Sequence, residues 1–485
     1  MINAKLVYKV IGSLLFIEAI MMLSCLLVSV YYEEDDIPAF LITITITVLA
    51  AIGLKYKGYG AENSMGRREA YLLVTLIWII FSGLGALPFV ISGYLTSYTD
   101  AFFETMSGFT TTGATIIDDV EALPHGLLFW RSLTHWIGGL GIVFFTIAIL
   151  PSLVGGSVKV FSAESTGPIK SKLHPRLSTS AKTIWAVYIV LSISCAAFFY
   201  IFGMGLFDSV NYAMSIVATG GFATHNESTA YFNSAAIDYT SIVFMLLSGA
   251  NFSLLYLVVI KGRIKEFFKD AEFRFYMLVV LLSTATIMYF LITHNDYSIS
   301  KALRNSLFQV AAFITTTGIF NDDAAKWPHI TWIILSLCMV FGACAGSTSG
   351  GIKCIRCAIL FRIIRNEFKR LLHPRAVLPV KINGNIVPNQ SVPTLLVFFT
   401  LYIAAVFFSY FTFTLLGVDS TNSMTIAISS ASNVGPTLGL EIGPTMSWSS
   451  LPDIGKWICS MLMLMGRLEF FSVIVLFTKA FWKEN

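Results

Sequence analysis

Long apolar runs constrain this chain more than any other feature of its sequence. Runs of about 20 predominantly apolar residues recur along its whole length, and each could cross about 30 Å of hydrocarbon as a helix. Only 12% of the 485 residues are charged, whereas a soluble domain usually carries about 25%. The first run, at residues 6–30, lacks the small-residue cleavage site of a signal peptide and is long enough to span. We therefore predict an all-α, multi-spanning membrane protein without a sizeable soluble domain.

Clusters of Lys and Arg predict the orientation of the chain. Most of the 32 basic residues fall in six clusters, and an acidic run at residues 33–36 lies between the first two. Basic clusters mark the cytoplasmic face of a membrane protein. Both termini are therefore predicted to be cytoplasmic, with an even number of crossings. The six clusters are Lys5 with Lys9, 55–68, 159–182, 261–274, 353–381 and 479–483.

One pattern repeats four times after two leading apolar segments at about 6–31 and 38–56. Each repeat has a long apolar helix, a short stretch rich in Thr, Ser or Gly, and a second long apolar helix. The glycines of the four stretches lie 107, 98 and 117 residues apart, and a period near 100 residues indicates duplicated units. Two leading helices and two per unit predict ten crossings, an even number. The four glycines are Gly113, Gly220, Gly318 and Gly435.

The repeat divides the chain into five segments. In each unit, an amphipathic segment of about 12 to 18 residues precedes the polar stretch and is too short to cross. Asp100, Asp208 and Asp419 lie near the starts of the first, second and fourth of these segments. Ser298 or Ser300 lies near the start of the third. Asp and Ser are good helix N-caps. The predicted segments are the leading helices at 1–68 and the units at 69–160, 161–270, 271–375 and 376–485.

The short amphipathic segments are predicted to be re-entrant helices that enter from the outer side and return as extended chain. Irregular backbone at membrane depth is tolerated only where protein buries it or water bathes it. Four such elements therefore predict one central pore, surrounded by four fused helix–pore loop–helix units in fourfold pseudosymmetry.

The four polar stretches have the composition expected of a potassium selectivity filter. Rings of backbone carbonyls replace the hydration shell of potassium without a full negative charge. Glycine lets the backbone turn successive carbonyls toward one axis, and the partially negative ends of the short helices would face the ion path. The predicted filter, which would bind potassium, is Thr110, Thr111, Thr112 and Gly113; Val217, Ala218, Thr219 and Gly220; Thr315, Thr316, Thr317 and Gly318; and Ser432, Asn433, Val434 and Gly435.

Acidic residues follow every predicted filter loop. On the outer side of the membrane they would raise the local concentration of cations, although each one taken singly is more typical of an ordinary solvated face. Small residues in membrane helices often serve close packing instead, but four equally spaced copies favour the filter. The acidic residues are Asp118, Asp119, Glu227, Asp322, Asp323 and Glu441.

Four segments carry a resemblance to a known family: Thr-Thr-Thr-Gly at 110–113, His-Trp-Ile-Gly-Gly-Leu-Gly at 135–141, residues 346–353, and Gly-Arg-Leu-Glu at 466–469. With these segments the chain resembles the TrkH potassium uptake proteins of bacteria, within the superfamily that holds the KtrB proteins and the plant high-affinity potassium transporters. The resemblance covers essentially the whole chain, and the two leading helices favour TrkH over KtrB. It implies potassium uptake at the inner membrane, a homodimer, and a cytosolic nucleotide-binding ring, TrkA; no cofactor is expected on this chain itself.

Filter composition matters within that superfamily. Some plant relatives have Ser for the first filter glycine and prefer sodium, whereas this chain has all four glycines. The fourth loop departs most, with Asn433 and Val434 in place of Thr, and the second loop has Ala218. These substitutions leave main-chain carbonyls available but put in doubt a ligand role for side-chain hydroxyls.

The second helix of the third unit is predicted to break at residues 342–351, which include several glycines. A phosphate-binding loop is disfavoured because the adjacent Gly-Lys-Ser/Thr is missing. In the TrkH-like family the corresponding loop blocks the pore below the filter, and plain helix packing is the alternative. The predicted gate is Gly346, Ser347, Thr348, Ser349, Gly350 and Gly351, held by Arg467.

Two charged residues, Arg467 and Glu469, lie in the last apolar run at 457–481. Charges within a membrane are functional candidates, and two residues apart on a helix they cannot face each other. Each is therefore predicted to have another partner. Arg467 would either act on the ion path or stabilise the carbonyls of the broken helix.

Control by a separate cytosolic protein is predicted because the cytoplasmic loops are short and lack a nucleotide motif. The expected contacts are Arg362, Arg365, Lys369 and Arg370, although ordinary cytoplasmic-face topology explains the same charges.

Other classes of protein fit less well. An ion-coupled symporter usually has two inverted repeats rather than four repeats of one orientation. An enzyme is not expected, because the seven histidines show no His-Glu-x-x-His spacing and no nucleophile motif or catalytic residue is evident. The seven cysteines predict no disulfides, and Cys354 and Cys357 lack a second pair that would complete a zinc site.

Overall fold

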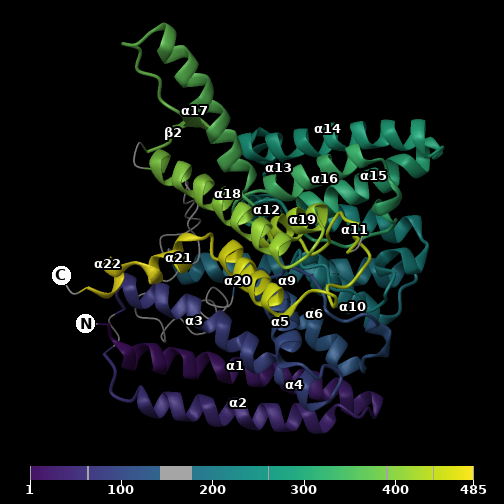
Figure 1. Cartoon of the computed structure of the whole chain (residues 1–485), viewed down its shortest axis with the longest axis vertical. Helices are drawn as coiled ribbons and strands as arrows, with labels where there is room; N and C mark the ends of the chain where they lie inside the picture. The colour runs from purple at the N-terminus through teal and green to yellow at the C-terminus, as the bar shows by residue number, and fades with distance from the viewer. Residues whose placement is uncertain are drawn as a thin grey trace.

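The computed structural model describes residues 2–62, 65–141, 177–259, 261–388, 391–440 and 442–483. These residues are almost entirely helical, as predicted, and most of the long helices run side by side (Figure 1). One antiparallel hairpin, β1 (Lys381–Ile382) with β2 (Asn385–Ile386), is the only sheet in the described ranges.

The two leading helices, α1 (Ala4–Tyr32) and α2 (Ile37–Lys57), form an antiparallel pair. The side chain of Asn3 caps α1 by accepting from the Leu6 amide, and Glu33 ends it in the left-handed region at φ 56°. Glycine permits close packing here, because a Cβ on Gly12 would lie 2.8 Å from the carbonyl oxygen of Ala51. The two predicted leading helices are therefore present.

Each of the four units begins with a long apolar helix and continues into a short one. The long helices are α3 (Arg67–Gly85) with its extension α4 (Leu87–Ile91), α9 (Leu177–Ile201), α14 (Ala271–His294) and α18 (Ser391–Leu415). The short ones, which we call the pore helices, are α5 (Tyr98–Phe109), α10 (Leu206–Val217), α15 (Ile299–Ile314) and α19 (Ser420–Ser432).

After each pore helix the chain returns through a loop to a further helix. Three of these loops contain a 3-10 turn: η1 (Val120–Ala122), η2 (Ser228–Phe232) and η3 (Ala324–Lys326). The further helices are α6 (His125–Gly139), α11 (Ala235–Ser248), α16 (His329–Phe341) and α20 (Asp453–Arg467). The rest are α12 (Phe252–Val259), α13 (Ile264–Lys269), α17 (Cys354–Leu372), α21 (Phe471–Ile474), η4 (Val475–Phe477) and α22 (Lys479–Trp482).

Six helices of the described chain are long and apolar enough to cross a membrane, and eight spans result if each bent pair counts as one. Ten crossings were predicted. The two that are missing from these eight would contain the short helices α6 and α16. Residues 142–176, which follow α6, lie outside the described residues, and α16 leads into a break. The protein is therefore a multi-pass membrane protein.

The second helices are interrupted more often than the sequence predicted. The expected break after α16 is present, since α17 begins only at Cys354. The chain also bends by 109° between α11 and α12 and by 111° between α20 and the following α21–η4 segment. The last apolar run, at 457–481, is therefore not one continuous helix, because Glu469 and Phe470 adopt positive φ and interrupt it there.

The predicted N-caps are confirmed for two pore helices and wrong for the other two. Ser298 caps α15 and Asp419 caps α19 through side-chain hydrogen bonds. Asp100 and Asp208 instead lie inside the first turns of α5 and α10, where a carboxylate interacts favourably with the helix dipole. Asp100 accepts from Lys456 of α20 at 2.6 Å, which links the fourth unit to the first.

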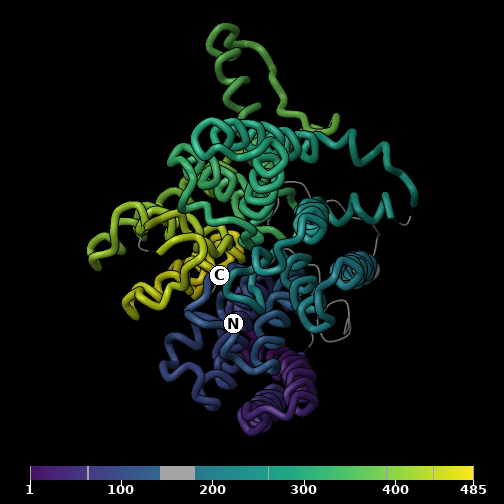
Figure 2. Tube along the Cα trace, turned by 90° about the vertical axis from the view of Figure 1, so that its right-hand side faces the viewer, coloured from purple at the N-terminus to yellow at the C-terminus, as the bar shows by residue number. Residues whose placement is uncertain are grey.

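Both ends of the chain lie at the same edge of the helical body (Figure 1). Helix α17 and the hairpin that follows it project from the body in both views (Figures 1 and 2). Asn383 of the hairpin ties this projection to the start of α14, because its side chain accepts from the Ala271 amide at 2.8 Å.

Candidate functional site

All four pore helices end in the same hydrogen-bonded turn. A residue in the left-handed region follows each helix, at φ between 53° and 57°. The next amide donates back to the carbonyl five residues earlier, as Thr112 does to Ser107 at 2.9 Å, which is the six-to-one bond of a Schellman motif. The equivalent bonds join Gly220 to Ser215, Thr317 to Ala312 and Val434 to Ser429. The left-handed residues are Thr111, Thr219, Thr316 and Asn433.

This shared turn corrects the sequence alignment of the second loop by one residue. Gly220 occupies the position of Thr112, and Gly221, at φ 95°, occupies that of Gly113, at φ 81°. Val217 is the last residue of α10 and corresponds to Phe109, so it lies outside the loop. The sequence alone could not fix this alignment, because Gly220 and Gly221 are adjacent and either of them could be matched with Gly113. The glycines in register, which we call the ring glycines, are Gly113, Gly221, Gly318 and Gly435.

Each ring glycine lies against a carbonyl of the next loop, and the order closes on itself. A Cβ on Gly113 would collide with the carbonyl oxygen of Gly220 in the second loop. Each of these glycines has positive φ and lacks space for a side chain, so it meets both conditions that favour glycine. The other contacts are Gly221 with the oxygen of Thr317, Gly318 with that of Val434, and Gly435 with that of Thr112.

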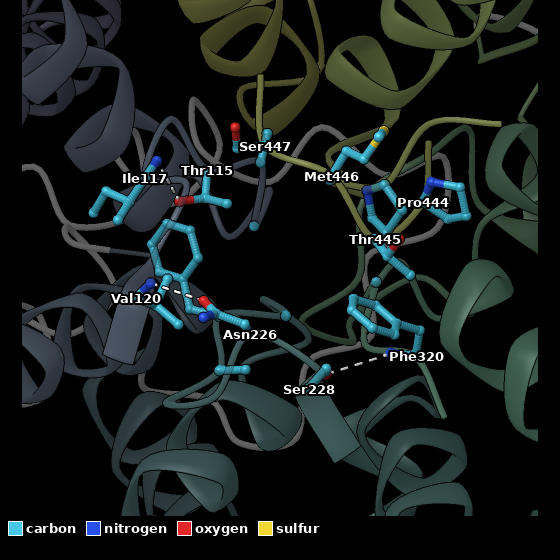
Figure 3. A pocket seen from close by; sticks show the side chains of 18 of the residues that line it. Thr115, Ile117, Val120, Asn226, Ser228, Phe320, Pro444, Thr445, Met446 and Ser447 are labelled. Carbon is cyan, nitrogen blue, oxygen red and sulfur yellow. Dashed lines mark hydrogen bonds between the residues drawn. The ribbon is translucent and has the colours of Figure 1, made fainter. Parts of the chain in front are cut away.

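A cavity of about 110 Å³, which we call the vestibule, lies beside the ring glycines. All four ring glycines line it, together with residues from the returning loops. Figure 3 shows Thr115, Asn226, Phe320 and Met446, one from each unit, around this space. A small ion entering the vestibule would therefore meet all four loops at once.

Threonine side chains in the loops are engaged in bracing the helix ends. The Thr110 and Thr112 hydroxyls are 2.8 Å apart, and Thr110 also donates to the Met106 carbonyl. Thr315 and Thr317 repeat the contact at 2.7 Å. These bonds favour main-chain carbonyls over side-chain hydroxyls as the groups that could face an ion.

Asn433 shows why the fourth loop departs from threonine. It occupies the left-handed position at φ 56°, which asparagine tolerates better than a β-branched residue. Its Nδ2 donates to Thr112 Oγ1 at 3.0 Å and to the Met463 carbonyl at 2.8 Å, so it also joins the fourth loop to the first.

The break between α16 and α17, residues 342–353, lies against the carboxyl ends of the pore helices; we call it the broken segment. The buried Thr348 hydroxyl is 3.2 Å from both the Val217 carbonyl and the Thr219 hydroxyl. Gly350 donates its amide to Thr316 Oγ1 at 2.7 Å, and Gly351 donates to the Ser432 carbonyl at 2.9 Å. The predicted gate residues therefore touch the second, third and fourth loops.

The side chain of Arg467 supplies the contact with the first loop. Its guanidinium donates to Thr348 O at 2.8 Å, to Thr111 Oγ1 at 3.2 Å, and to the carbonyls of Gly138 and Gly139. Glu469 pairs instead with Arg356 of α17. The prediction that Arg467 and Glu469 have separate partners is confirmed.

The predicted acidic residues occupy several different environments. Asp118 lines the vestibule, whereas Asp119 and Asp323 cap short 3-10 turns and Glu227 stands at the start of a third.

Asp322 accepts hydrogen bonds from Tyr297, Asn305 and Trp327 and so braces the third loop. Burial, reinforced by the nearby Asp322 carboxylate, raises the pKa of Tyr297 to about 12. Glu441 lies outside the described residues.

Sequence reasoning missed three residues that hold the first loop. Arg131 lies in α6 and pairs with the buried Glu104 of α5 at 2.8 Å. His135 Nδ1 is 2.8 Å from the Gly108 carbonyl, and its Nε2 accepts from the Phe222 amide at 3.2 Å. The available signal was a pair of opposite charges next to one polar stretch.

Comparison with known proteins gives a consistent assignment. The TrkH family model, described as a cation transport protein, matches residues 36–484. A Trk system potassium uptake protein TrkH from Salmonella typhimurium is 36% identical, with 99% of each chain covered. TrkG from Escherichia coli, also described as a Trk system potassium uptake protein, is 36% identical over the same shares.

A solved structure agrees with the sequence comparisons. The crystal structure of the potassium transporter TrkH from Vibrio parahaemolyticus superposes with a TM-score of 0.89 at 33% identity, covering 99% of each chain. The similarity thus extends over the leading helices, the four pore helices and the broken segment together. The chain belongs to the TrkH family of cation transport proteins, whose members are transporters rather than enzymes.

Proposed function

We propose that this protein takes up potassium across the bacterial inner membrane through a filter lined by backbone carbonyls of its four loops. The observation that carries the proposal is the closed order of contacts, in which each ring glycine lies against a carbonyl of the next loop. The names of the relatives, potassium uptake proteins of Trk systems, support the identity of the ion.

The four units would surround one pore with fourfold pseudosymmetry. Support comes from the identical turn at the end of each pore helix and from a vestibule that all four loops line. In this arrangement the filter residues that bind the transported potassium come from equivalent stretches of the four loops. With the second loop in register, these stretches are 110–113, 218–221, 315–318 and 432–435.

The chemistry of the ring suits a weakly held monovalent cation. Backbone carbonyls replace water around the ion without a full charge that would trap it. The pore helices direct their partially negative carboxyl ends at the same region. A side chain at a ring glycine would displace a carbonyl, so the absence of a Cβ keeps the ion path open.

The broken segment would act as a gate on the side of the ring opposite the vestibule. It contacts the second, third and fourth loops directly, and Arg467 bridges it to the first. The guanidinium there adds a positive charge next to the helix ends, which would oppose cation passage. Opening requires residues 346–351 to move aside, and their small side chains reduce the steric cost.

A cytosolic nucleotide-binding subunit of the TrkA kind would control this gate. The words "Trk system" in the relatives' names support a transporter with partner subunits. Helix α17 continues directly from the broken segment and projects from the body (Figure 1). Arg365, Lys369 and Arg370 on its far half are exposed and Arg362 is half-buried, so this helix offers a basic docking surface. We further propose that the transporter is a homodimer.

Both termini would face the cytoplasm. They lie at the same edge of the helical body, where Lys55 and Lys57 also occupy the last turn of α2 (Figure 1). This placement agrees with the tendency of basic residues to remain on the cytoplasmic side.

Ion flux into reconstituted vesicles tests the proposal. Vesicles that contain the purified protein should accumulate rubidium or potassium down an imposed gradient, and excess sodium should compete poorly. Protein-free vesicles provide the background. Equal competition by sodium and potassium would contradict a potassium filter, and no flux from the variant with a deleted gate would contradict an ion pathway.

A further inference from the structure

We propose that Glu104 and Arg131 form a buried clamp that fixes the distance between the first and second loops and thereby sets ion discrimination on that side of the ring. The inference rests on the proposed potassium filter and assigns a role to two residues outside it. Both are positioning residues, because they would act on the ion through the loops they hold.

Arg131 uses its whole guanidinium to join two units. Its Nε donates to Glu104 Oε1 at 2.8 Å, its Nη2 donates to Thr115 Oγ1 at 3.2 Å, and its Nη1 donates to the Ala223 carbonyl at 3.1 Å. The ring of Phe222 lies against the guanidinium, with Cζ 4.2 Å from the ring centroid. Glu104 and Thr115 belong to the first unit, whereas Phe222 and Ala223 belong to the second.

The attachment points are equivalent in the two loops. Thr115 lies two residues after Gly113, and Ala223 lies two residues after Gly221, so Arg131 spans matching positions beside the ring. Arginine suits this task because its five donors have a fixed planar arrangement. A lysine at the same position could reach one or two of these acceptors but could not hold all of them in one geometry.

Glu104 completes the attachment on the first loop. Its Oε2 accepts from the Ile116 amide at 2.8 Å, and its Oε1 lies 3.0 Å from the Thr115 hydroxyl. The Glu104 and Arg131 side chains are 1% and 2% exposed. Breaking a pair buried to this extent leaves an uncompensated charge, so displacement of either loop is strongly opposed.

The clamp lies at one of the four contacts between neighbouring loops of the ring, the contact between the first and second loops. Seven residues before the left-handed residue, where the first pore helix has Glu104, the other three have Tyr212, Gln309 and Ile426. The third loop is held to the second unit by Thr229, which donates to the Phe320 carbonyl at 2.8 Å, and by the Asn321 side chain, which donates to Asp238 at 3.1 Å; Asp238 also pairs with the partly exposed Arg304 at 3.4 Å. Between the first and second loops, in contrast, the fully buried charged pair bonds to the backbone of both loops, at the Ile116 amide and the Ala223 carbonyl. This contact should therefore yield least when a smaller ion draws the carbonyls inward.

The pair also controls charge at the vestibule. Arg131 lines this cavity, and the carboxylate of Glu104 balances its charge. Loss of Glu104 alone would leave a positive charge beside the ion path and reduce cation entry. Loss of the hydroxyl bridge at Thr115 would leave both charges in place and loosen only the loop. The two changes therefore separate charge from geometry.

Rubidium uptake with sodium competition measures the clamp in reconstituted full-length protein. Thr115→Val and Arg131→Lys should lower the potassium-over-sodium ratio by about tenfold, comparable to the loss of one hydrogen bond to a charged group. Glu104→Gln should lower both this ratio and total flux. Thr115→Ser keeps the hydroxyl and should retain the potassium-over-sodium ratio of the wild type. Asp100→Asn, which removes the negative charge that pairs with Lys456 one turn before Glu104 on the same helix, should leave the ratio unchanged.

Amide hydrogen exchange provides a readout independent of transport. The Ile116 amide should exchange faster in Thr115→Val and Glu104→Gln than in the wild type, while Thr115→Ser should not differ. Wild-type selectivity in both Thr115→Val and Arg131→Lys, with inserted and folded protein, would overturn the clamp. If wild-type protein itself did not discriminate potassium from sodium, the proposed filter would fail instead, and unchanged exchange at Ile116 would refute the clamp in that case as well.

Discussion

The guanidinium of Arg467 donates a 2.8 Å hydrogen bond to the carbonyl oxygen of Thr348, which joins the end of α20 to the middle of the broken segment. The same guanidinium reaches Thr111 in the first loop and the carbonyls that end α6. One side chain of the fourth unit thus holds a segment of the third unit against the first. This arrangement satisfies carbonyls left unpaired where helices end, and it also places a charge on the proposed ion path.

Removing this attachment should open the pathway. We expect Arg467→Ala, or deletion of residues 346–351, to raise potassium flux without a regulatory partner by about tenfold or more, because hydrogen bonds to a charged group are lost. Rubidium influx into vesicles measures the effect, and selectivity over sodium should be largely retained. Arg263→Ala, at an exposed site, is the matched control. Flux equal to wild type in both gate variants would place the gate elsewhere.

The ring glycines should determine selectivity. Alanine at Gly113, Gly221, Gly318 or Gly435 should reduce potassium-over-sodium discrimination, since a Cβ would meet a carbonyl of the next loop. The left-handed backbone adds a cost of about 1–3 kcal/mol. Competition uptake assays measure the ratio.

Gly203→Ala is the control for backbone strain. Gly203 has φ 100° but nothing within 4 Å of the added Cβ, so this variant carries the conformational cost without a collision. Unchanged selectivity at two or more ring glycines, or an equal loss in Gly203→Ala, would count against a single carbonyl ring.

Asn433 should contribute measurably to stability. Asn433→Ala removes two hydrogen bonds, to Thr112 and Met463, each contributing about 1 kcal/mol. Alanine also tolerates the left-handed region less well than asparagine. We expect a lower melting temperature in detergent. Asn233→Ala, at the exposed left-handed residue that ends η2 (φ 41°), isolates the conformational part; an equal shift in both variants would mean that the hydrogen bonds contribute little.

Charge reversal on α17 should weaken binding of the proposed cytosolic subunit. Exposed ion pairs contribute up to about 1 kcal/mol each, so reversing Arg362, Arg365, Lys369 and Arg370 to Glu together should reduce affinity at least about tenfold. A pull-down with the partner at low salt measures it. Reversal of Lys479 and Lys483 at the carboxyl end is the control. Intact binding by the α17 variant would exclude this surface.

Much of the architecture could be predicted from the sequence because hydropathy and repeat period are properties of whole segments. The two leading helices, the four short pore helices and the break after α16 follow from runs of apolar residues and from glycine density. The additional bends after Ser248 and Arg467 were not predicted. At each bend only three residues separate the two helices, and at the second bend Glu469 and Phe470 adopt a positive φ that no local composition signals.

The site was predicted less completely, for physical reasons that can be named. Residues within one loop were recognisable from composition, but the register of Gly220 and Gly221 depends on the turn that ends α10. The roles of Arg131 and Glu104 depend on a contact across 27 residues of sequence. Asp100 and Asp208 resembled caps because a first-turn carboxylate and a capping carboxylate have the same sequence neighbourhood.

The closed order of contacts among the ring glycines bears on how duplicated units can diverge. A residue inserted between a pore helix and its ring glycine would shift a carbonyl that a neighbouring unit needs, so one such event would disturb two repeats. In all four units the ring glycine follows the left-handed residue by the same two positions. Beyond the ring, the chain reaches its next helix at His125, Ala235, His329 and Asp453 after stretches of unequal length. The differences in length between the repeats therefore lie where an insertion or deletion alters the structure of one repeat only.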